Sequence, residues 1–293
     1  TIELNQRQRQ PIKTYFVLME RKHLFATLLL LLCIISFVSC VKEEDDTRTT
    51  CTSGCTVIMG RILTSENQPL PGINFEVNYK KTTGIHYILT RKKAVTESDK
   101  DGFYDMRFHL KDDELLQDES YRTFEMNINL ERLDPELYIL PKDMISHIDA
   151  STDPPTTTAA DVAPEITASM RLKRDTVYDV NCYVPQKKYI KVTLKGFKPQ
   201  QKGDCFEVCT LFPWGFEEND WNDKMLDTKY GIGGSGWDRF KASTEDQTFT
   251  EVPFALNDSN IVRIIKVKNG VAMPEDHKIY VSGDSPTNLT YEY

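Results

Sequence analysis

All three tryptophans of the chain fall within one short stretch of its C-terminal half, among glycines, acids and amides. Trp214, Trp221 and Trp237 share that stretch with Asn219 and Asp220. Indole faces stack on the C–H groups of pyranose rings, and amide and carboxylate oxygens accept hydrogen bonds from sugar hydroxyls. One interpretation is therefore a loop that binds a glycan ligand. The other, which we favour, is that the rings fill the edge of a small β-sandwich while the glycines form the loop.

Carboxylates near these tryptophans do not indicate a hydrolase. Glycoside hydrolysis needs two carboxyl groups that face each other across a bound sugar. Glu217, Glu218 and Asp220 are close neighbours on a loop, and a small sandwich lacks the usual catalytic cleft. We therefore expect no catalytic residue and predict that the chain is not an enzyme.

The residues that could bind a metal ion are dispersed along the sequence. The five histidines of the chain form no HExxH motif and no cluster with cysteines, which zinc sites require. Asp99 to Gly102 resembles the start of a calcium loop, but position twelve of that loop would be Leu110 instead of the required glutamate. We interpret this stretch as a hairpin turn and predict no metal site.

The cysteines indicate one small disulfide. Cys51 and Cys55 flank a glycine-containing turn and are close enough in sequence to form a short bridge. Cys205 and Cys209 have an even spacing, so on one strand they would face the same side, too far apart to bond. Together with Cys182 these make an odd number, which leaves at least one thiol free, and we expect it to be buried.

Composition excludes other classes of function. The 293 residues include 36 Lys and Arg against 44 Asp and Glu, a net charge of −8. A nucleic-acid-binding protein needs a basic face to displace counterions from phosphates, so no nucleic-acid partner is expected. The sequence contains no Walker-type or GxGxxG phosphate loop, and it indicates no cofactor.

The N-terminal region has the pattern of a secretory leader. Two basic residues precede an apolar run from Leu24 to Val38, which is shorter than the roughly 20 residues that span a bilayer. We predict that residues 19–39 are a signal peptide that starts at Met19. Residues 1–18 are then expected to be an upstream extension that is not part of the native protein.

The leader ends in Phe37-Val38-Ser39-Cys40, which resembles the lipobox of bacterial lipoproteins. The resemblance implies that the signal peptide is cut before Cys40 and that Cys40 is the lipidation site. Acyl chains contribute about 0.8 kcal/mol per buried CH₂, enough in combination to hold a folded domain on a membrane. We therefore expect the chain to contact the outer membrane through its N-terminal lipid.

An acidic run follows the cysteine at once. It resembles the export signal of lipoproteins in some Gram-negative bacteria, which implies display on the outer face of the outer membrane. The alternative is a solvated acidic tether, and we expect residues 40–54 to form a flexible, lipidated tether. Loss of residues 1–39 would change the net charge from −8 to −11. The residues of the run are Lys42, Glu43, Glu44, Asp45 and Asp46.

Short segments with a two-residue period fill the rest of the chain. Phe124 to Leu130 alternates apolar and polar side chains, and Ile190 to Lys195 repeats the pattern. Gly, Pro and Asp separate such segments, and no long segment has the 3.6-residue period of a helix. The pattern predicts an all-β fold of two tandem antiparallel β-sandwiches, Ig-like or prealbumin-like, over residues 55–185 and 186–293.

Three motifs stand in the first of these expected sandwiches. They are a glycine-bearing strand at Val57–Ile62, a P-x-x-G turn into an alternating strand at Gln68–Val77, and T-x-x-D-x-x-G-x-[FY] within Val95–Tyr104. Together they resemble a carboxypeptidase-regulatory-like, or transthyretin-like, module over roughly residues 56–110. Modules of that family are seldom catalytic, so the resemblance implies a structural or adhesive unit.

These features together predict a non-enzymatic, lipid-anchored protein of the outer membrane that faces the cell exterior and has a binding or scaffolding role. Two alternatives stay open. One is a glycan-binding accessory lipoprotein of a polysaccharide-uptake system, which would use the tryptophan-rich loop. The other is a structural component of a fimbria or envelope complex. The expected partner is accordingly a glycan or a surface protein.

Overall fold

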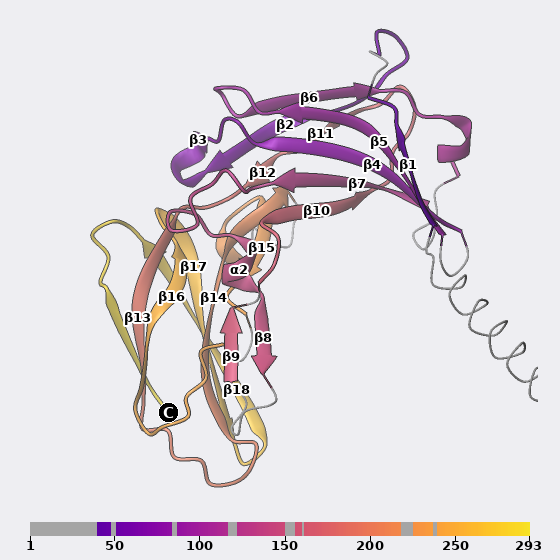
Figure 1. Ribbon diagram of the computed structural model, residues 1–293. Coiled ribbons are helices and arrows are strands. Elements are labelled where there is room, and N and C mark those ends of the chain that lie inside the picture. Colours follow the sequence, from indigo (N-terminus) through magenta and orange to yellow (C-terminus); the bar gives the residue numbers. More distant parts are fainter. Residues whose placement is uncertain are drawn as a thin grey trace, which may run out of the picture.

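The chain folds into two β-lobes joined in a bent shape (Figure 1). The computed structural model describes residues 40–47, 51–83, 87–116, 122–149, 156–159, 161–217, 225–236 and 239–293. Nearly all regular structure in these ranges is strand, which confirms the predicted all-β class. Within the same ranges, no helix combines the length and the apolar character needed to cross a lipid bilayer.

The first lobe is a sandwich with a five-stranded sheet on one side. That sheet has the order β1-β5-β4-β7-β10, and β3, β6, β11 and β12 are grouped around β2 on the other side. Apolar side chains from both layers form one buried cluster. The elements are β1 (Cys40–Asp45), β2 (Thr56–Thr64), η1 (Ser65–Asn67), β3 (Gln68–Pro69), β4 (Asn74–Thr83), β5 (Tyr87–Glu97), β6 (Phe103–Phe108), η2 (Asp112–Glu114), β7 (Arg122–Asn129), β10 (Glu165–Met170), β11 (Val177–Asp179) and β12 (Cys182–Tyr183).

The second lobe packs a three-stranded sheet, β16-β13-β19, against a layer formed by β14, β15, β17 and β18. A second buried apolar cluster lies between these layers. The strands are β13 (Lys187–Lys195), β14 (Cys205–Glu217), β15 (Tyr230–Gly234), β16 (Gln247–Ala255), β17 (Asp258–Lys268), β18 (Val271–Val281) and β19 (Asn288–Glu292).

A small unit lies beside the second lobe (Figure 1). It begins with the short helix α2 (Pro141–Met144) and continues into a two-stranded sheet of β8 (Ser146–Asp149) and β9 (Thr156–Ala159). Proline stands at the first helical position, where its missing N–H costs nothing. The threonines of β9 are β-branched, which favours a strand.

Side-chain alternation explains why the strands form where they do. In β7, Phe124, Met126 and Ile128 are fully buried while the residues between them are partly exposed. This confirms the strand predicted from Phe124 to Leu130, and β13 likewise confirms the strand predicted from Ile190 to Lys195. A pleated strand sends alternate side chains to opposite faces, so a two-residue period places one face on a core.

One sheet runs through both lobes. Its order is β11-β2-β12-β14-β17-β18, and β12 pairs with β2 on one side and with β14 on the other. The first half of β14 contributes Phe206 and Val208 to the second core. Near its end, Trp214 and Phe216 pack against the first core. The two sandwiches are therefore fused through shared backbone pairing as well as linked along the chain.

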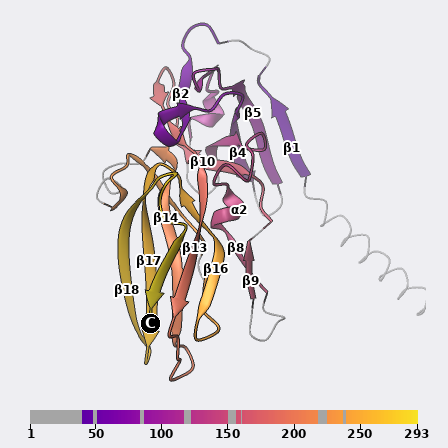
Figure 2. The same ribbon diagram turned by 90° about the vertical axis from the view of Figure 1, so that its left-hand side faces the viewer.

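The start of the expected tether is part of the first sandwich. β1 pairs in parallel with β5, from Cys40 opposite Tyr87 to Asp45 opposite Lys92. Figure 2 shows β1 at the outer edge of its sheet, beside β5. The segment has the charged composition of a tether, but edge pairing requires only backbone N–H and C=O groups, which composition does not report. Residues 40–45 are thus an edge strand and differ from the flexible tether expected there.

Two further features differ from the sequence-based expectation. Asp99 to Gly102 forms a tight turn, in which the Gly102 N–H donates to the Asp99 carbonyl at 2.9 Å. The turn joins β5 to β6, which belong to different sheets, so it is a corner between layers and not a hairpin. In addition, β1–β5, β11–β2, β12–β2 and β13–β19 pair in parallel within an otherwise antiparallel arrangement.

Candidate functional site

The two lobes meet at the segment that precedes α2. The Ile139 N–H donates to the Pro185 carbonyl at 3.1 Å, and the Lys187 N–H donates to the Leu137 carbonyl at 2.8 Å. These bonds pair the segment with the start of β13 in the manner of an added strand. The loop before α2 is therefore held in a fixed position against the second lobe.

A buried ion pair lies inside this junction. Lys187 Nζ is 3.2 Å from each carboxylate oxygen of Asp143 and 2.6 Å from the carbonyl oxygen of Pro135. Asp143 Oδ2 also accepts the Leu140 N–H at 2.9 Å, and the Arg239 guanidinium donates to the Asp143 carbonyl at 2.9 Å. The two side chains are 0% and 3% exposed. Buried charges are tolerated when paired and hydrogen-bonded, so this network fixes the geometry of the junction.

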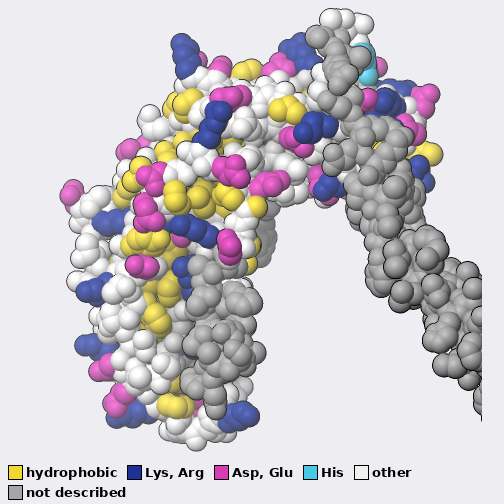
Figure 3. Space-filling view, in the orientation of Figure 1, with side chains coloured by type: hydrophobic (Ala, Val, Ile, Leu, Met, Phe, Trp, Pro, Cys, Tyr) yellow, Lys and Arg dark blue, Asp and Glu magenta, His cyan; other side chains and the backbone are white. Residues whose placement is uncertain are grey.

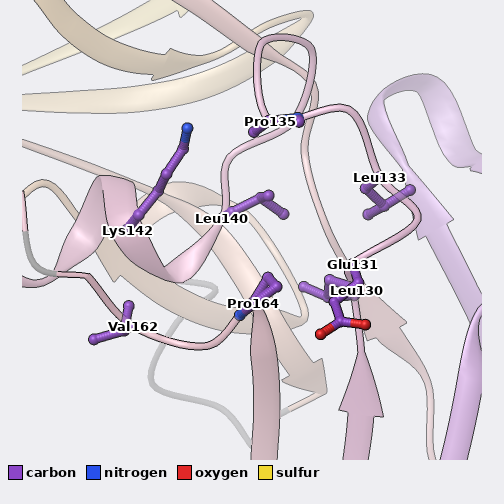
Figure 4. Close-up of a pocket in the computed structure, with 8 residues that line it drawn as sticks. All are labelled: Leu130, Glu131, Leu133, Pro135, Leu140, Lys142, Val162 and Pro164. Atoms are coloured by element: carbon purple, nitrogen blue, oxygen red, sulfur yellow. The ribbon is translucent and has the colours of Figure 1, made fainter.

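An apolar pocket of about 270 Å³ opens beside the ion pair. Its floor is made by Leu130, Leu133 and Leu140, which are buried members of the first core. Glu131 and Lys142 stand on opposite sides, with the carboxylate and the ammonium directed away from each other (Figure 4). The pocket thus combines an apolar interior with one acid and one base at its rim. The lining residues are Leu130, Glu131, Leu133, Pro135, Leu140, Lys142, Val162 and Pro164.

Trp214, the first candidate for stacking on a sugar, packs within the junction. Its half-buried ring lies against the small cluster of Ile139, Phe212 and Ala255. The indole N–H donates to the Ile139 carbonyl at 3.3 Å. These contacts favour the interpretation that the tryptophan ring fills the edge of a sandwich, because a ring packed in this way offers less of its face to a ligand. The other candidates, Trp221, Trp237, Asn219 and Asp220, lie outside the described residues.

A second link between the lobes involves two stacked tyrosines. The Tyr183 hydroxyl, on β12, donates to Asp258 Oδ2 at the start of β17. The Tyr183 ring also stacks on Tyr230, with ring centroids 4.7 Å apart. Burial raises the pKa of the Asp258 carboxyl, and the hydrogen bond from Tyr183 offsets only part of this rise. The Tyr183–Asp258 hydrogen bond therefore links the two lobes, and the carboxyl group that accepts it has a pKa raised by burial.

Asp46, the last residue of the predicted export run, is held by cations of the first lobe. Its carboxylate accepts hydrogen bonds from Lys93 Nζ at 2.8 Å and Lys111 Nζ at 2.7 Å. Lys93 also contacts both oxygens of the buried Glu114 side chain, to which Arg91 donates at 2.6 Å. Burial alone would raise the pKa of Asp46, but the hydrogen bonds from the two lysines bring it below its ordinary value.

The other residues of the predicted lipidation and export signals lie in β1. The structure describes their backbone, which pairs with β5. Lipidation and export themselves stay predictions. The residues concerned are Cys40, Lys42, Glu43, Glu44 and Asp45.

The other described cysteines include one disulfide. Cys51 and Cys55 form it, whereas Cys182, Cys205 and Cys209 are not disulfide-bonded. Burial raises the pKa of the Cys209 thiol to about 12, and burial raises that of Cys182 further still. Such thiols are not nucleophiles near neutral pH. No group of three or more His, Cys, Asp or Glu within the described ranges is arranged to hold a metal ion.

Sequence reasoning missed the pocket and the ion pair beside it. The pocket takes residues from 130–142 and from 162–164, and the ion pair joins Asp143 to Lys187. No local spacing relates these segments, because residues 130–142 and 162–164 meet through the pairing of β7 with β10, and Lys187 reaches Asp143 from the start of the second lobe. One usable signal was the concentration of leucine and proline between residues 130 and 141, which is unusual for an exposed loop.

Comparisons with known proteins assign no family. No family model and no curated protein matches the chain. A streptococcal ancillary pilin is 7% identical over 83% of this chain and 63% of its own, with a TM-score of 0.26. The shaft pilin SpaA from Lactobacillus rhamnosus GG is 9% identical over 82% and 98%, with a TM-score of 0.24. A 9R-lipoxygenase from Cyanothece PCC8801 is 14% identical over 49% and 18%, with a TM-score of 0.26. Scores this low do not establish a shared fold, and nothing about function follows from them.

Proposed function

We propose that this chain is a non-enzymatic protein held at the outer membrane by acyl chains on Cys40, where it binds or scaffolds other molecules at the cell surface. The observation that supports the proposal is the sequence Phe37-Val38-Ser39-Cys40, which follows an apolar run and resembles a lipobox. Cys40 is the first residue of β1, so a cut before Cys40 would leave β1 and its pairing with β5 whole.

The position of β1 suits a direct attachment to the membrane. β1 starts at the end of the first lobe that lies away from the second lobe (Figure 1). Acyl chains on Cys40 would hold that end of the first lobe at the bilayer, and the second lobe would extend from the other end. The fused sheet and the buried Lys187–Asp143 pair favour a rigid body of this kind.

Metabolic labelling tests the anchor. The full chain is produced in a Gram-negative host that is fed an alkyne-tagged palmitate, and the purified protein is examined for label. Label on the chain that is lost in Cys40→Ala and kept in Cys33→Ala is the expected result. The Cys33 control matters because that cysteine also lies in the apolar leader. Label that persists in Cys40→Ala, or no label at all, would overturn the anchor.

Protease treatment of intact cells tests surface display. The triple variant Glu43→Ala, Glu44→Ala, Asp45→Ala removes most of the acidic run but leaves Asp46, whose contacts with Lys93 and Lys111 belong to the fold. We expect digestion of the wild-type protein on intact cells and protection of the triple variant, with acylation unchanged. Protection of the wild-type protein would contradict exposure on the cell exterior.

A further inference from the structure

The pocket at the end of the first core is already formed in the free protein. One wall is fixed because the Leu130 N–H donates to the Pro164 carbonyl at 2.8 Å. The facing wall is fixed because Lys187, itself paired with Asp143, donates to the Pro135 carbonyl at 2.6 Å. A site whose walls are held by such bonds needs little ordering when a ligand enters, so more of the contact energy remains as affinity.

The size and lining of the pocket define the kind of group it can hold. Its volume of about 270 Å³ lies just below the 300–1,000 Å³ that is typical of pockets for whole small molecules. Six of the eight lining residues are leucine, valine or proline, and none is aromatic. Stacking on a sugar ring is therefore unavailable, and a single bulky apolar side chain fits the lining best.

Two unpaired charges flank this apolar interior. Neither Glu131 nor Lys142 has an ion-pair partner among the described side chains. They stand on opposite sides of the pocket (Figure 4). A fatty acid would satisfy Lys142 but would meet repulsion at Glu131, and an uncharged apolar molecule would use neither. A ligand with an apolar group between an anion and a cation complements both.

Further apolar surface surrounds the opening. Leu137, in the loop that contributes Pro135, is 58% exposed, and Ile145, directly after α2, is 46% exposed. Figure 3 shows hydrophobic side chains gathered on this face where the two lobes meet. Exposed apolar surface concentrated around a pocket is typical of an interaction site.

We propose that this pocket binds an extended peptide segment. A side chain the size of leucine or phenylalanine enters the pocket, an acidic neighbour pairs with Lys142, and a basic neighbour pairs with Glu131. The inference deepens the binding role proposed above and rests on it for its cellular setting. The two proposals are tested separately. Acylation of Cys40 tests the membrane anchor, and the affinity for a peptide tests the pocket.

Fluorescence anisotropy with short peptides tests the proposal on the full chain in lipid nanodiscs. The probes are end-capped, labelled peptides with the cores Asp-Phe-Lys and Lys-Phe-Asp, which present the charges in opposite orders. We expect one order to bind more tightly than the other. Replacing Phe by Ser in that peptide should weaken binding about tenfold or more, because a buried apolar side chain contributes about 1.5–3 kcal/mol.

Charge reversal at the rim provides the decisive variant. In the double variant Glu131→Lys, Lys142→Glu the preference should switch to the peptide of opposite order. Glu131 is exposed, Lys142 is half-buried, and neither has an ion-pair partner among the described residues, so the fold should be retained. Lys202→Glu, an exposed lysine in the turn before β14, is the matched control and should leave both affinities unchanged.

Filling the pocket provides a second, independent variant. Val162→Trp places a large ring at the half-buried wall and should abolish binding of both peptides, with folding checked by an unchanged melting temperature. Absence of saturable binding by either peptide would overturn the proposal, as would equal affinity for the Ser peptide or unchanged preference after charge reversal. Displacement by decanoate at lower concentration than by unlabelled peptide would assign the pocket to a lipid instead.

Discussion

The two lobes finish their sheets in opposite ways. In the first lobe, β1 covers β5, and the charges behind that edge are buried, with Lys93 and Glu114 only 1% and 0% exposed. In the second lobe, β18 is the outermost strand of its sheet within the described part, and most of its residues are exposed. There Arg263 and Asp276 form a bidentate pair at 2.7 and 2.8 Å, with side chains 24% and 41% exposed.

Similar ion pairs therefore have different effects at the two edges, as Lys93–Glu114 and Arg263–Asp276 illustrate. At a covered edge the charges are removed from water, so each depends on its partner and the group resists rearrangement. At an open edge they remain hydrated, contribute little to stability, and discourage pairing with another strand. Pro274 on β18 acts in the same direction, because it lacks the N–H that an added strand would use.

The largest expected effect is at the covered edge. Glu114→Ala should lower the free energy of unfolding by about 3–5 kcal/mol, because Arg91 and Lys93 would stay buried without the carboxylate that they share. Urea denaturation measures this. Asp276→Ala removes a carboxylate from a comparable pair on β18 and should change the free energy by at most about 1 kcal/mol. Equal losses in the two variants would contradict the distinction between the edges.

The junction between the lobes should behave like the covered edge. Lys187→Met should cost about 3 kcal/mol, because it leaves the buried Asp143 carboxylate without its cation. Adding Asp143→Asn should recover much of this loss, since the amide oxygen can still accept the Leu140 N–H. A double-mutant cycle in urea measures the coupling. Additive losses would show that the two side chains do not act as a pair.

A moderate effect is expected from the tryptophan at the junction. Trp214→Ala should cost about 2 kcal/mol, less than the 3–5 kcal/mol of a fully buried aromatic, because the ring is half-buried. Trp214→Phe should retain most of the stability but lose the hydrogen bond to the Ile139 carbonyl. Thermal unfolding with and without a panel of glycans checks this. Unchanged stability in Trp214→Ala together with lost glycan binding would restore the ligand-binding interpretation.

The smallest expected effects concern pH, and their signs differ between the lobes. The pKa of Asp46 is lowered, so its contribution to stability is present above the ordinary value of 3.8 and is lost as the pH falls. The pKa of Asp258 is raised by burial, so the folded chain holds its proton more tightly than the unfolded chain. That contribution is present below 3.8 and is lost as the pH rises through the folded-state value.

The pH prediction is checked by comparing the stability of each variant with that of the wild-type chain. Relative to the wild-type chain, Asp258→Asn should gain stability as the pH rises above about 4, whereas the loss of stability in Asp46→Asn should be largest above about 4 and should shrink as the pH falls below it. Melting temperatures of the three proteins at several pH values give the two differences. Parallel pH profiles for the two variants would show that the carboxyl groups have similar environments.

The sequence predicted where strands lie along the chain far better than which strands pair with one another. Phe124 to Leu130 revealed β7 because a two-residue period reports burial on one face, and it reports nothing about the neighbouring strand. β5 was missed because Arg91 and Lys93 suggest an exposed surface, although both are buried against Glu114. Only the later part of the chain supplies that carboxylate, so the local pattern was misleading.

The candidate site was harder to predict for a related reason. The tryptophans were conspicuous by composition, yet Trp214 is occupied by contacts with the junction. The pocket depends on Leu130, Leu140 and Pro164, which are ordinary residues in sequence and meet only after β7 and β10 have paired and the first core has formed. Rare residue types are visible in a sequence, whereas a concave surface is a property of the assembled chain.

The strand β2 has a consequence for how the chain reaches its folded state. Its neighbours β11 and β12 come from far along the sequence, as the Arg61 N–H shows by donating to Asn181 Oδ1, 120 residues away. During synthesis from the N-terminus, β2 would have one side unpaired until residues 177–183 are made. Such long-range pairing slows folding and leaves an unpaired strand edge that is prone to aggregation until the later strands are in place.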